Sequence, residues 1–312
     1  MSFKFSNDNK RYHTLSFYNK QKYGQNVYKA CVNANLTCPN VDGTKGVGGC
    51  IYCESGSTYF THKNLSICEQ IKTEIERINK NGKDNKFIVY YQSNTNTHTS
   101  CENIKNMLDT ALKFDNVVGV TFSPRTDCLD SEKLELLPGY NKQTEICLEF
   151  GLQSAHDNTL EFLNRKQTFL EFEREFLEVK KYGIRTCIHI INGLPNETKE
   201  NMIYTAKAVS RLKPDGIKIH MLHVSQGTTL ASIYESEPFQ LLSMECYAQI
   251  VCEQLEYIDE SIVVERITGD PDKSKLIAPI WTANKKATIA TIDKLQAKLN
   301  SYQGKQKGKE NV

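Results

Sequence analysis

Three cysteines lie on one glycine-rich loop that reads Cys38-Pro-Asn-Val-Asp-Gly-Thr-Lys-Gly-Val-Gly-Gly-Cys50-Ile-Tyr-Cys53. The loop directly follows a β-rich run at Val27–Val32, so three thiols come together just after a predicted strand. Its glycines and its proline let the backbone wrap closely around a bulky group, and they leave little apolar side chain for packing. We therefore interpret this stretch as a ligand-binding loop at the end of a strand.

Cysteines at this spacing are compatible with two kinds of metal centre. The pair Cys50-x-x-Cys53 is half of a zinc knuckle, but structural zinc needs four ligands. His62 and Cys68 are candidates for a fourth ligand, and each lies in or beside a predicted helix rather than in a second knuckle. A set of three cysteines leaves one coordination position open, which suits an iron-sulfur cluster that binds and reduces a small molecule there.

Outward from this loop, β-rich runs alternate with segments of helical periodicity. The alternation predicts an α/β fold of βα units around a parallel sheet, and each gap is long enough for a right-handed crossover. Six strands are expected at Val27–Val32, Phe87–Tyr91, Val117–Phe122, Glu145–Phe150, Arg185–Ile191 and Ile217–His223. Helices are expected at Leu65–Asn79, Cys101–Lys113, Ser131–Leu137, Asn158–Tyr182 with a break near Arg165, and Lys199–Leu212.

The pattern changes after Val224, where we expect a small α+β extension. It contains a predicted helix at Leu242–Ile258, a strand at Ile262–Ile267 and a closing helix at Asn284–Leu299. The expected organisation is a basic and aromatic segment at 1–24, the α/β unit at 25–224, the extension packed on that unit at 225–303, and a disordered, Lys-rich tail at 304–312.

The composition is that of a folded protein with reduced cysteines. Of its 312 residues, 39% are hydrophobic and 24% are charged, which are ordinary values for a globular chain. No stretch approaches the roughly 20 apolar residues of a membrane helix, and Met1–Lys10 lacks the apolar core of a signal peptide. The 11 cysteines are an odd number and cannot all pair within one chain. We expect a cytoplasmic protein without membrane association.

Basic charge gathers at the two ends of the chain, although the formal net charge is only +2. Residues 1–30 interleave lysines and arginine with aromatic residues, and residues 285–312 carry seven lysines against two acids. Because cations neutralise phosphates and aromatic rings stack on bases, the two ends are candidates for an RNA-facing surface. The alternative is a pair of solvated, partly frayed termini.

Further landmarks follow the cysteine loop in a fixed order. They are Tyr91-Gln-Ser-Asn-Thr-Asn-Thr97, Leu148-Glu-Phe-Gly-Leu-Gln-Ser154, Gly193-Leu-Pro-Asn-Glu-Thr198, Lys218-Ile-His-Met-Leu-His223, Glu265-Arg-Ile-Thr-Gly-Asp270 and Ile277-Ala-Pro-Ile-Trp281 with Lys285. Together with a widened cysteine loop, they resemble the radical S-adenosylmethionine (SAM) superfamily, and in particular a bacterial family related to the catalytic subunit of Elongator. The resemblance covers residues 25–300. It implies a partial, TIM-like barrel of six βα units with the active site at the carboxyl ends of the strands.

The resemblance also implies the cofactors and their ligands. Cys38, Cys50 and Cys53 would bind three irons of a [4Fe-4S] cluster, and the fourth iron would bind SAM. An electron from a reduced flavodoxin- or ferredoxin-type protein would cleave SAM to methionine and a 5'-deoxyadenosyl radical, which abstracts hydrogen from the substrate. The implied cofactor contacts are Tyr52 at the adenine, Gln92, Ser93 and Asn94 at the methionine amino group, Glu149 at the ribose, Gln153 at the methionine carboxylate, and Arg125 and Asn192. The implied catalytic residues are His220 and His223.

Each of these polar residues has a structural alternative as a buried, hydrogen-bonded group inside the barrel. The segment Ser123-Pro-Arg-Thr-Asp127 departs from the family pattern Thr-Arg-Pro-Asp, so Arg125 and Asp127 keep their charges in a different turn. Other cysteines are expected to be small buried hydrophobes, because they fall within predicted strands or a predicted helix. These are Cys31, Cys147, Cys187, Cys246 and Cys252.

For the substrate, the resemblance implies a tRNA wobble uridine. The implied reaction converts 5-carboxymethylaminomethyluridine, or its 2-thio form, to the 5-aminomethyl form. One alternative is a radical SAM enzyme that acts on a small metabolite or a protein side chain, and retained tRNA binding would argue against it. Another is a zinc-stabilised, non-catalytic RNA-binding module that uses the same cysteines, and iron and sulfide in place of zinc would argue against it.

Overall fold

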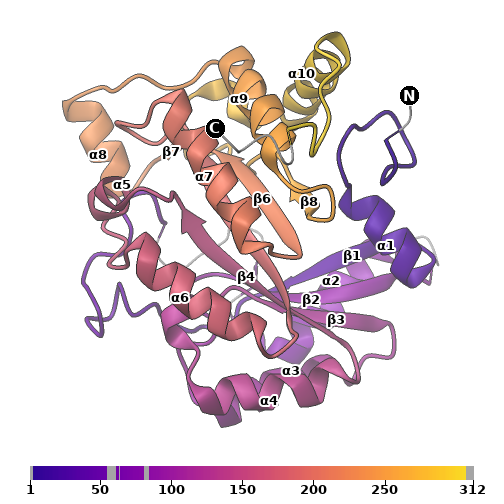
Figure 1. The fold of residues 1–312 in the computed structure, drawn as a ribbon. Helices are drawn as coiled ribbons and strands as arrows, with labels where there is room; N and C mark the ends of the chain where they lie inside the picture. Colours follow the sequence, from indigo (N-terminus) through magenta and orange to yellow (C-terminus); the bar gives the residue numbers. More distant parts are fainter. Residues whose placement is uncertain (1–2, 55–60, 63, 81–83, 307–312) are drawn as a thin grey trace.

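The computed structural model describes residues 3–54, 61–62, 64–80 and 84–306. In this part of the chain, parallel strands form one sheet of seven in the order β1-β2-β3-β4-β5-β6-β8 (Figure 1). The outer strands β1 and β8 do not pair with each other, so the barrel is open on one side. The strands are β1 Val27–Val32, β2 Lys86–Tyr91, β3 Val117–Phe122, β4 Glu145–Gln153, β5 Arg185–Asn192, β6 Gly216–Met221 and β8 Val263–Arg266.

Helices cover the outer face of the sheet (Figure 1). Three of them begin with a capping box, in which the side chain before the helix and the third helical residue satisfy each other's backbone N–H. Within the described residues, no helix is both long and apolar enough to cross a membrane. The helices are α2 Ile67–Ile78, α3 Cys101–Ala111, α4 Ser131–Asn141, α5 Asp157–Phe162, α6 Phe169–Lys180, α7 Lys199–Leu212, α9 Met244–Tyr257 and α10 Lys285–Lys298.

Side chains of each strand alternate between the helices and the barrel interior, as the two-residue period of a strand requires. In β4, Phe150 packs outward, and its ring lies 5.8 Å from the ring of Phe176 in α6. Cys147 and Glu149 of the same strand face the interior. The interior is unusually polar toward the carboxyl ends of the strands, where it holds Lys29, Tyr90, Glu149, His189, Lys218 and His220.

All six strands expected for the barrel are present, and the fold class is confirmed. The strand expected at Ile262–Ile267 is also present, as β8, but it joins the main sheet beside β6. The sheet therefore has one strand more than the six βα units predict. Pairing with β8 satisfies the backbone groups that β6 would otherwise expose at a sheet edge. The expected helix break near Arg165 separates α5 from α6.

The rest of the extension lies at the same end of the barrel as the cysteine loop and on its outer face (Figure 1). Two short strands, β7 Val224–Ser225 and β9 Leu276–Ala278, pair antiparallel. Helix α8 Thr229–Ser236 follows β7, and α9 packs between α7 and α10. This arrangement agrees with the α+β extension expected from the sequence.

The N-terminal segment closes the opposite end of the barrel. Helix α1 Leu15–Tyr23 lies at the amino ends of the strands, where the Tyr18 hydroxyl donates to the Glu145 carboxylate at 2.6 Å. The Lys86 ammonium donates to the Tyr23 carbonyl at 3.0 Å. The alternative of frayed ends therefore does not hold for residues 3–24. Any RNA-facing surface formed by them would lie at the end of the barrel away from the cysteine loop.

The two ends of the chain pack on each other. Lys10 forms an ion pair with Asp293 in α10, and the Gln303 side chain accepts from the His13 N–H at 2.7 Å. Gly304 and Gln306 donate backbone N–H groups to carbonyls of α9, at 3.0 and 2.9 Å. The disordered tail expected from Gly304 onward does not begin there, because these hydrogen bonds hold 304–306 on α9. Residues 307–312 lie outside the described residues.

Candidate active site

A cavity of about 300 Å³ opens at the carboxyl ends of the strands, where the cysteine loop leaves β1. Its lining includes most of the side chains expected to bind the cofactors, together with several that the sequence analysis did not assign. The expected residues are Cys38, Cys50, Cys53, Tyr52, Gln92, Ser93, Asn94, Arg125, Glu149 and Gln153. The additional residues include Tyr90, Thr95, Arg165 and His189.

The cysteine loop is held between α5 and α8 through Ile51. The Ile51 N–H donates to the Leu163 carbonyl at 3.1 Å, and the Ile51 carbonyl accepts from the Leu230 N–H at 2.8 Å. The three side chains also pack in one small apolar cluster. Since Ile51 stands between Cys50 and Cys53, this anchoring fixes the direction in which both thiols point.

Hydrogen-bond donors surround the cysteine sulfurs. The Thr95 hydroxyl donates to Cys38 Sγ at 3.3 Å, and the Asn40 amide donates to Cys50 Sγ at 3.6 Å. The Arg165 guanidinium also lies 3.9 Å from Cys50 Sγ. Donors and a cation at this range stabilise thiolates, which are the form that binds metal.

The same sulfurs lie close enough to influence one another. Although the Cys53 side chain is exposed, partial desolvation and then the charges of Cys50 and Cys38 raise the pKa of its thiol. A positive cluster core removes this repulsion, so iron binding and loss of the thiol protons are coupled. Among the described residues, no group of three or more His, Cys, Asp or Glu is arranged to hold a single metal ion. A cluster binds each thiolate to a different iron, and the three cysteines of this cavity fit that requirement.

Unpaired polar atoms line the rest of the cavity. Gln92 Nε2 and Arg165 Nε are buried and lack a hydrogen-bond partner among the described residues. A buried donor without a partner costs about 1–3 kcal/mol, so such groups indicate a polar ligand. Ser93, Asn94 and Gln153 adopt positive φ angles of 72°, 59° and 75°, and backbone strain of this kind is concentrated at ligand sites. The cavity therefore fits the amino acid and ribose groups of SAM.

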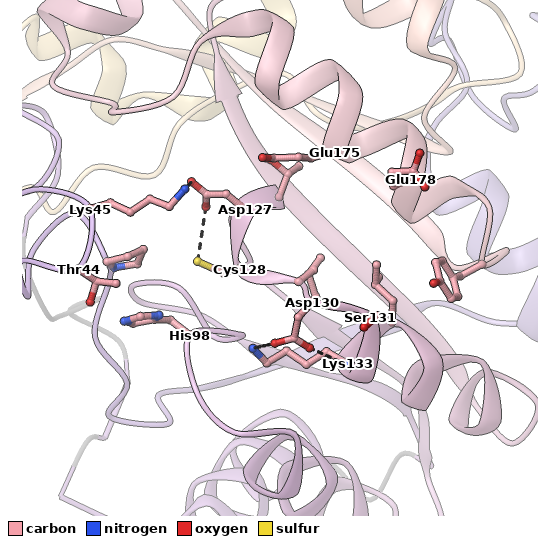
Figure 2. A pocket seen from close by; sticks show the side chains of 15 residues that line it. Thr44, Lys45, His98, Asp127, Cys128, Asp130, Ser131, Lys133, Glu175 and Glu178 are labelled. Carbon is pink, nitrogen blue, oxygen red and sulfur yellow. Dashed lines mark hydrogen bonds and ion pairs between the residues drawn. The ribbon is translucent and has the colours of Figure 1, made fainter.

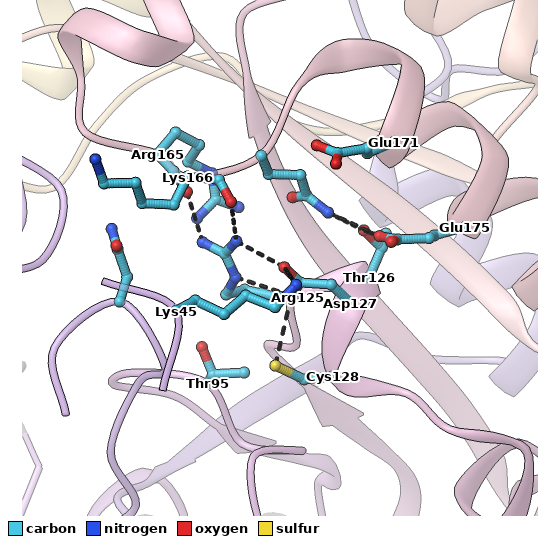
Figure 3. Close-up of polar contacts among 12 residues, drawn as sticks. Lys45, Thr95, Arg125, Thr126, Asp127, Cys128, Arg165, Lys166, Glu171 and Glu175 are labelled. Atoms are coloured by element: carbon cyan, nitrogen blue, oxygen red, sulfur yellow. Dashed lines mark hydrogen bonds and ion pairs between the residues drawn. The ribbon is translucent and has the colours of Figure 1, made fainter. Parts of the chain in front are cut away.

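Arg125 stabilises the wall of the cavity rather than presenting free donors to it (Figure 3). Its guanidinium makes two hydrogen bonds to the Asp127 carboxylate, at 2.9 and 2.8 Å, and one to the Arg165 carbonyl at 2.9 Å. Lys45 of the cysteine loop reaches the same carboxylate at 2.8 Å. Burial by itself would raise the pKa of Asp127, but Arg125 and then Lys45 hold it well below its usual range.

A second cavity, of about 520 Å³, lies behind this ion pair (Figure 2). Lys45, His98, Asp127 and Cys128 line its inner side. Asp130 and Lys133 form an ion pair at 2.7 Å on the far side. The two lysines shown in Figure 2 are therefore paired with carboxylates, and Glu175 and Glu178 add two further acidic groups to the lining.

Glu149 at the floor of the cofactor cavity is surrounded by basic side chains from three strands. Its carboxylate lies 2.8 Å from the Lys29 ammonium and 3.1 Å from His189 Nε2, and it forms an ion pair with Lys218. Burial alone would raise the pKa of Glu149, but Lys218 and then Lys29 hold it well below the usual value. Burial, followed by the charge of Lys218, lowers the pKa of His189. The floor therefore combines a charged carboxylate with a neutral imidazole.

The remaining expected residues do not line the cofactor cavity. Asn192 exchanges two hydrogen bonds with Gln254 of α9, at 2.8 and 2.9 Å. Strand alternation explains this position, because His189 faces the interior and Asn192, three residues later, faces the helices. His220 lies two residues beyond Lys218, the sheet partner of His189, toward the carboxyl end of β6, and its ring lies 5.4 Å from that of His189. His223 lies beyond β6, and the imidazoles of both His220 and His223 have a buried nitrogen without a partner among the described residues.

Lys29, Arg165 and Lys218 are site residues that the sequence analysis missed. A signal was available for the two lysines. Each is a lone charge at an interior-facing position of a predicted strand, and a buried charge is paired or functional. Arg165 carried no such signal, because it was assigned only to the break between two helices.

Comparison with known proteins agrees with this geometry. Residues 44–209 match the Radical SAM superfamily, and residues 214–297 match the Radical SAM C-terminal domain. The uncharacterized protein YtqA of Bacillus subtilis is 39% identical over 97% of this chain and 95% of its own length. Protein YhcC of Escherichia coli is 31% identical over 88% of each chain.

More distant similarities extend to other members. A tRNA-2-methylthio-N(6)-dimethylallyladenosine synthase from Fusobacterium nucleatum is 27% identical over 53% of this chain and 39% of its own length. The structure of the archaeal Elp3 from Methanocaldococcus infernus shares the fold, with a TM-score of 0.69 and 16% identity over 92% of this chain and 68% of that chain. The matches across most of the chain, together with the cavity that gathers three cysteines, show that this protein is a radical SAM enzyme, of a superfamily whose members bind a [4Fe-4S] cluster and SAM.

Proposed function

We propose that this chain modifies the wobble uridine of tRNA, by converting 5-carboxymethylaminomethyluridine or its 2-thio form to the 5-aminomethyl form. The observation that carries the proposal is a pair of lysines at the floor of the cofactor cavity. Lys29 and Lys218 meet there around Glu149, and Lys29 also lies 3.8 Å from the Glu265 carboxylate. A substrate side chain that ends in a carboxylate requires such cations, because an unpaired buried charge is costly.

The name of one relative also supports a tRNA substrate. The Fusobacterium relative is a tRNA-2-methylthio-N(6)-dimethylallyladenosine synthase by name. In the proposed reaction, the bound cofactors would supply a 5'-deoxyadenosyl radical that abstracts hydrogen from the carboxymethyl methylene. The carbon radical then loses one electron to give an imine, and water breaks the C–N bond to release the 5-aminomethyl nucleoside and glyoxylate. The electron comes from a reduced flavodoxin- or ferredoxin-type protein.

The residues of this chain position the reactants. Cys38, Cys50 and Cys53 hold the cluster, and Gln92 and Arg165 offer their unpaired donors to the polar groups of SAM. The Glu149 network holds the substrate carboxylate through its lysines. His220 and His223 each carry a buried imidazole nitrogen without a partner among the described residues, and these nitrogens would contact a substrate group.

The test is anaerobic reconstitution of the full chain with iron and sulfide, followed by incubation with SAM, a reductant and tRNA that carries the carboxymethylaminomethyl nucleoside. We expect 5'-deoxyadenosine and the 5-aminomethyl nucleoside to appear together in a mass spectrometric assay. Cys38→Ala should lose both products and the cluster absorbance, whereas Cys246→Ala, at an exposed cysteine of α9, should retain them. Formation of 5'-deoxyadenosine with unchanged tRNA nucleosides would refute the tRNA assignment and favour a metabolite or protein substrate.

A further inference from the structure

A third cavity, of about 470 Å³, lies on the rim of the barrel outside the cofactor cavity. It is built from the loop after β4, helix α5, the loop after β5 and the first turns of α7. Since both loops leave the carboxyl ends of their strands, the cavity lies at the same end of the barrel as the cysteine loop. Its lining includes His156, Asn158, Phe162, Pro195, Asn196 and Tyr204.

Aromatic faces are exposed in this cavity. The Phe162 side chain in α5 is 36% exposed and Tyr204 in α7 is 44% exposed. The His156 ring lies 5.2 Å from the Tyr204 ring, so the tyrosine is supported from one side while its surface remains accessible. Exposed aromatic side chains that converge on a polar cavity mark binding sites for flat ligands.

Amide groups with no internal partner stand beside these rings. Asn158 and Asn196 are exposed, and neither side-chain amide makes a hydrogen bond within the part of the chain that the structure describes. Each amide offers a donor and an acceptor, which is the combination that reads the edge of a nucleobase. The Asn201 side chain is not available in this way, because its amide oxygen accepts from the Thr198 N–H in the capping box of α7.

The cavity has a fixed relation to the cysteine loop. Leu163, the residue after Phe162, accepts the hydrogen bond from the Ile51 N–H between the cluster cysteines. Phe162 in the wall of the rim cavity is therefore adjacent in the chain to Leu163, which anchors the loop between Cys50 and Cys53. A cation also lies outside it, because the Arg211 guanidinium lies 5.7 Å from the Tyr204 ring on the exposed face of α7.

We propose that this rim cavity binds an unpaired nucleobase of the RNA substrate, next in the strand to the nucleotide that enters the cofactor cavity. The base stacks on Tyr204 or Phe162, its edge meets the amides of Asn158 and Asn196, and Arg211 neutralises an adjacent phosphate. This inference rests on the proposed tRNA function and adds a second point of contact with the RNA. Stacking of a flanking base holds the strand in register while the modified nucleotide is extruded.

The experiment measures the affinity of the reconstituted holoenzyme for a fluorescent anticodon stem-loop RNA by anisotropy, at fixed salt concentration. Loss of base stacking typically weakens binding by about tenfold or more. We expect that effect for Tyr204→Ala and for Phe162→Ala. Tyr204→Phe, which keeps the ring, should bind within about twofold of the parent, as should the control Leu170→Ala at a 71% exposed apolar residue of α6.

The outcomes separate this proposal from the proposed reaction. The 5'-deoxyadenosine formed from SAM without RNA should be the same in all variants, because none of the substituted residues lines the cofactor cavity. Weakened RNA binding in both alanine variants supports the proposal that the rim cavity binds a nucleobase, even if the nucleoside product differs from the one proposed. Normal affinity in both variants overturns it, even if the parent enzyme modifies tRNA as proposed, and so does a parent enzyme that does not bind the RNA.

Discussion

Glu149 is the residue on which the charge balance of the barrel interior depends. It is 2% exposed and lies among Lys29, Lys218 and His189. Glu149→Gln removes the carboxylate that pairs with the buried Lys218 and with Lys29, and breaking a buried ion pair in this way costs about 3–5 kcal/mol. Urea unfolding of the cluster-free protein measures the loss of unfolding free energy. The matched substitution Glu178→Gln, at an exposed pair with Lys181, should change it by less than about 0.5 kcal/mol.

The same carboxylate predicts a dependence on pH. Lysines hold the pKa of Glu149 below its value in the unfolded chain, which is about 4.3. Its contribution to stability is therefore complete above that unfolded pKa and is lost as the pH falls through the folded pKa. We expect the difference in unfolding free energy between the parent and Glu149→Gln to narrow as the pH falls below about 4. A difference that stays constant down to pH 2 would contradict the ion-pair explanation.

Arg165 provides a second test, at the cofactor cavity. Its guanidinium lies near Cys50 Sγ and retains a buried, unpaired Nε. Lysine keeps the charge but lacks the planar fork of donors, so Arg165→Lys should retain the cluster and lose affinity for SAM by about tenfold or more. Iron content and equilibrium binding of SAM measure the two effects separately. Arg174→Lys, at an exposed arginine of α6, is the control, and equal SAM affinity in both variants would exclude the role of Arg165.

Helices α5 and α8 together hold the cysteine loop in position. Ile51 is 8% exposed and packs against Leu163 and Leu230. Ile51→Ala leaves a cavity between the two helices, which should cost about 2–5 kcal/mol and loosen the position of the cysteines. Iron content after reconstitution should fall, and thermal unfolding should begin at a lower temperature. Val47→Ala on the same loop is the comparison, because Val47 is 73% exposed and should change neither quantity.

Across the whole molecule, Gln303 ties the end of the chain to its beginning and to β8. Its side chain accepts from the His13 N–H and donates to the carbonyls of Asp259 and Ile262, at 2.7, 2.7 and 2.8 Å. Gln303→Ala removes the partner of the buried His13 N–H and of the Ile262 carbonyl and should cost about 2–4 kcal/mol, since one such buried group costs about 1–3 kcal/mol. Urea unfolding measures this loss of unfolding free energy. Tyr302→Ala, at a neighbour that is 41% exposed, should have a much smaller effect, and equal losses would contradict this account.

Local patterns in the sequence determined the elements and the cysteine loop. The alternation of β-rich and helical segments predicted six strands of a parallel sheet, and the glycine-rich run from Cys38 to Cys53 predicted a ligand-binding loop at the end of the first strand. Both signals involve residues close in the chain, whose periodicity and backbone freedom act before any distant contact forms. The position of Asn192 also followed a local rule, the two-residue period of β5, that the sequence analysis did not apply.

Only the tertiary structure decided which charges meet. Glu149 lies 120 residues from Lys29 and 69 residues before Lys218, and no short-range pattern links three residues on different strands. The addition of β8 to the sheet and the convergence of α5 and α7 on the rim cavity are likewise set by how the barrel curves and closes. Contacts between distant residues depend on this global geometry, because many chain arrangements satisfy the same local preferences and only packing selects one of them.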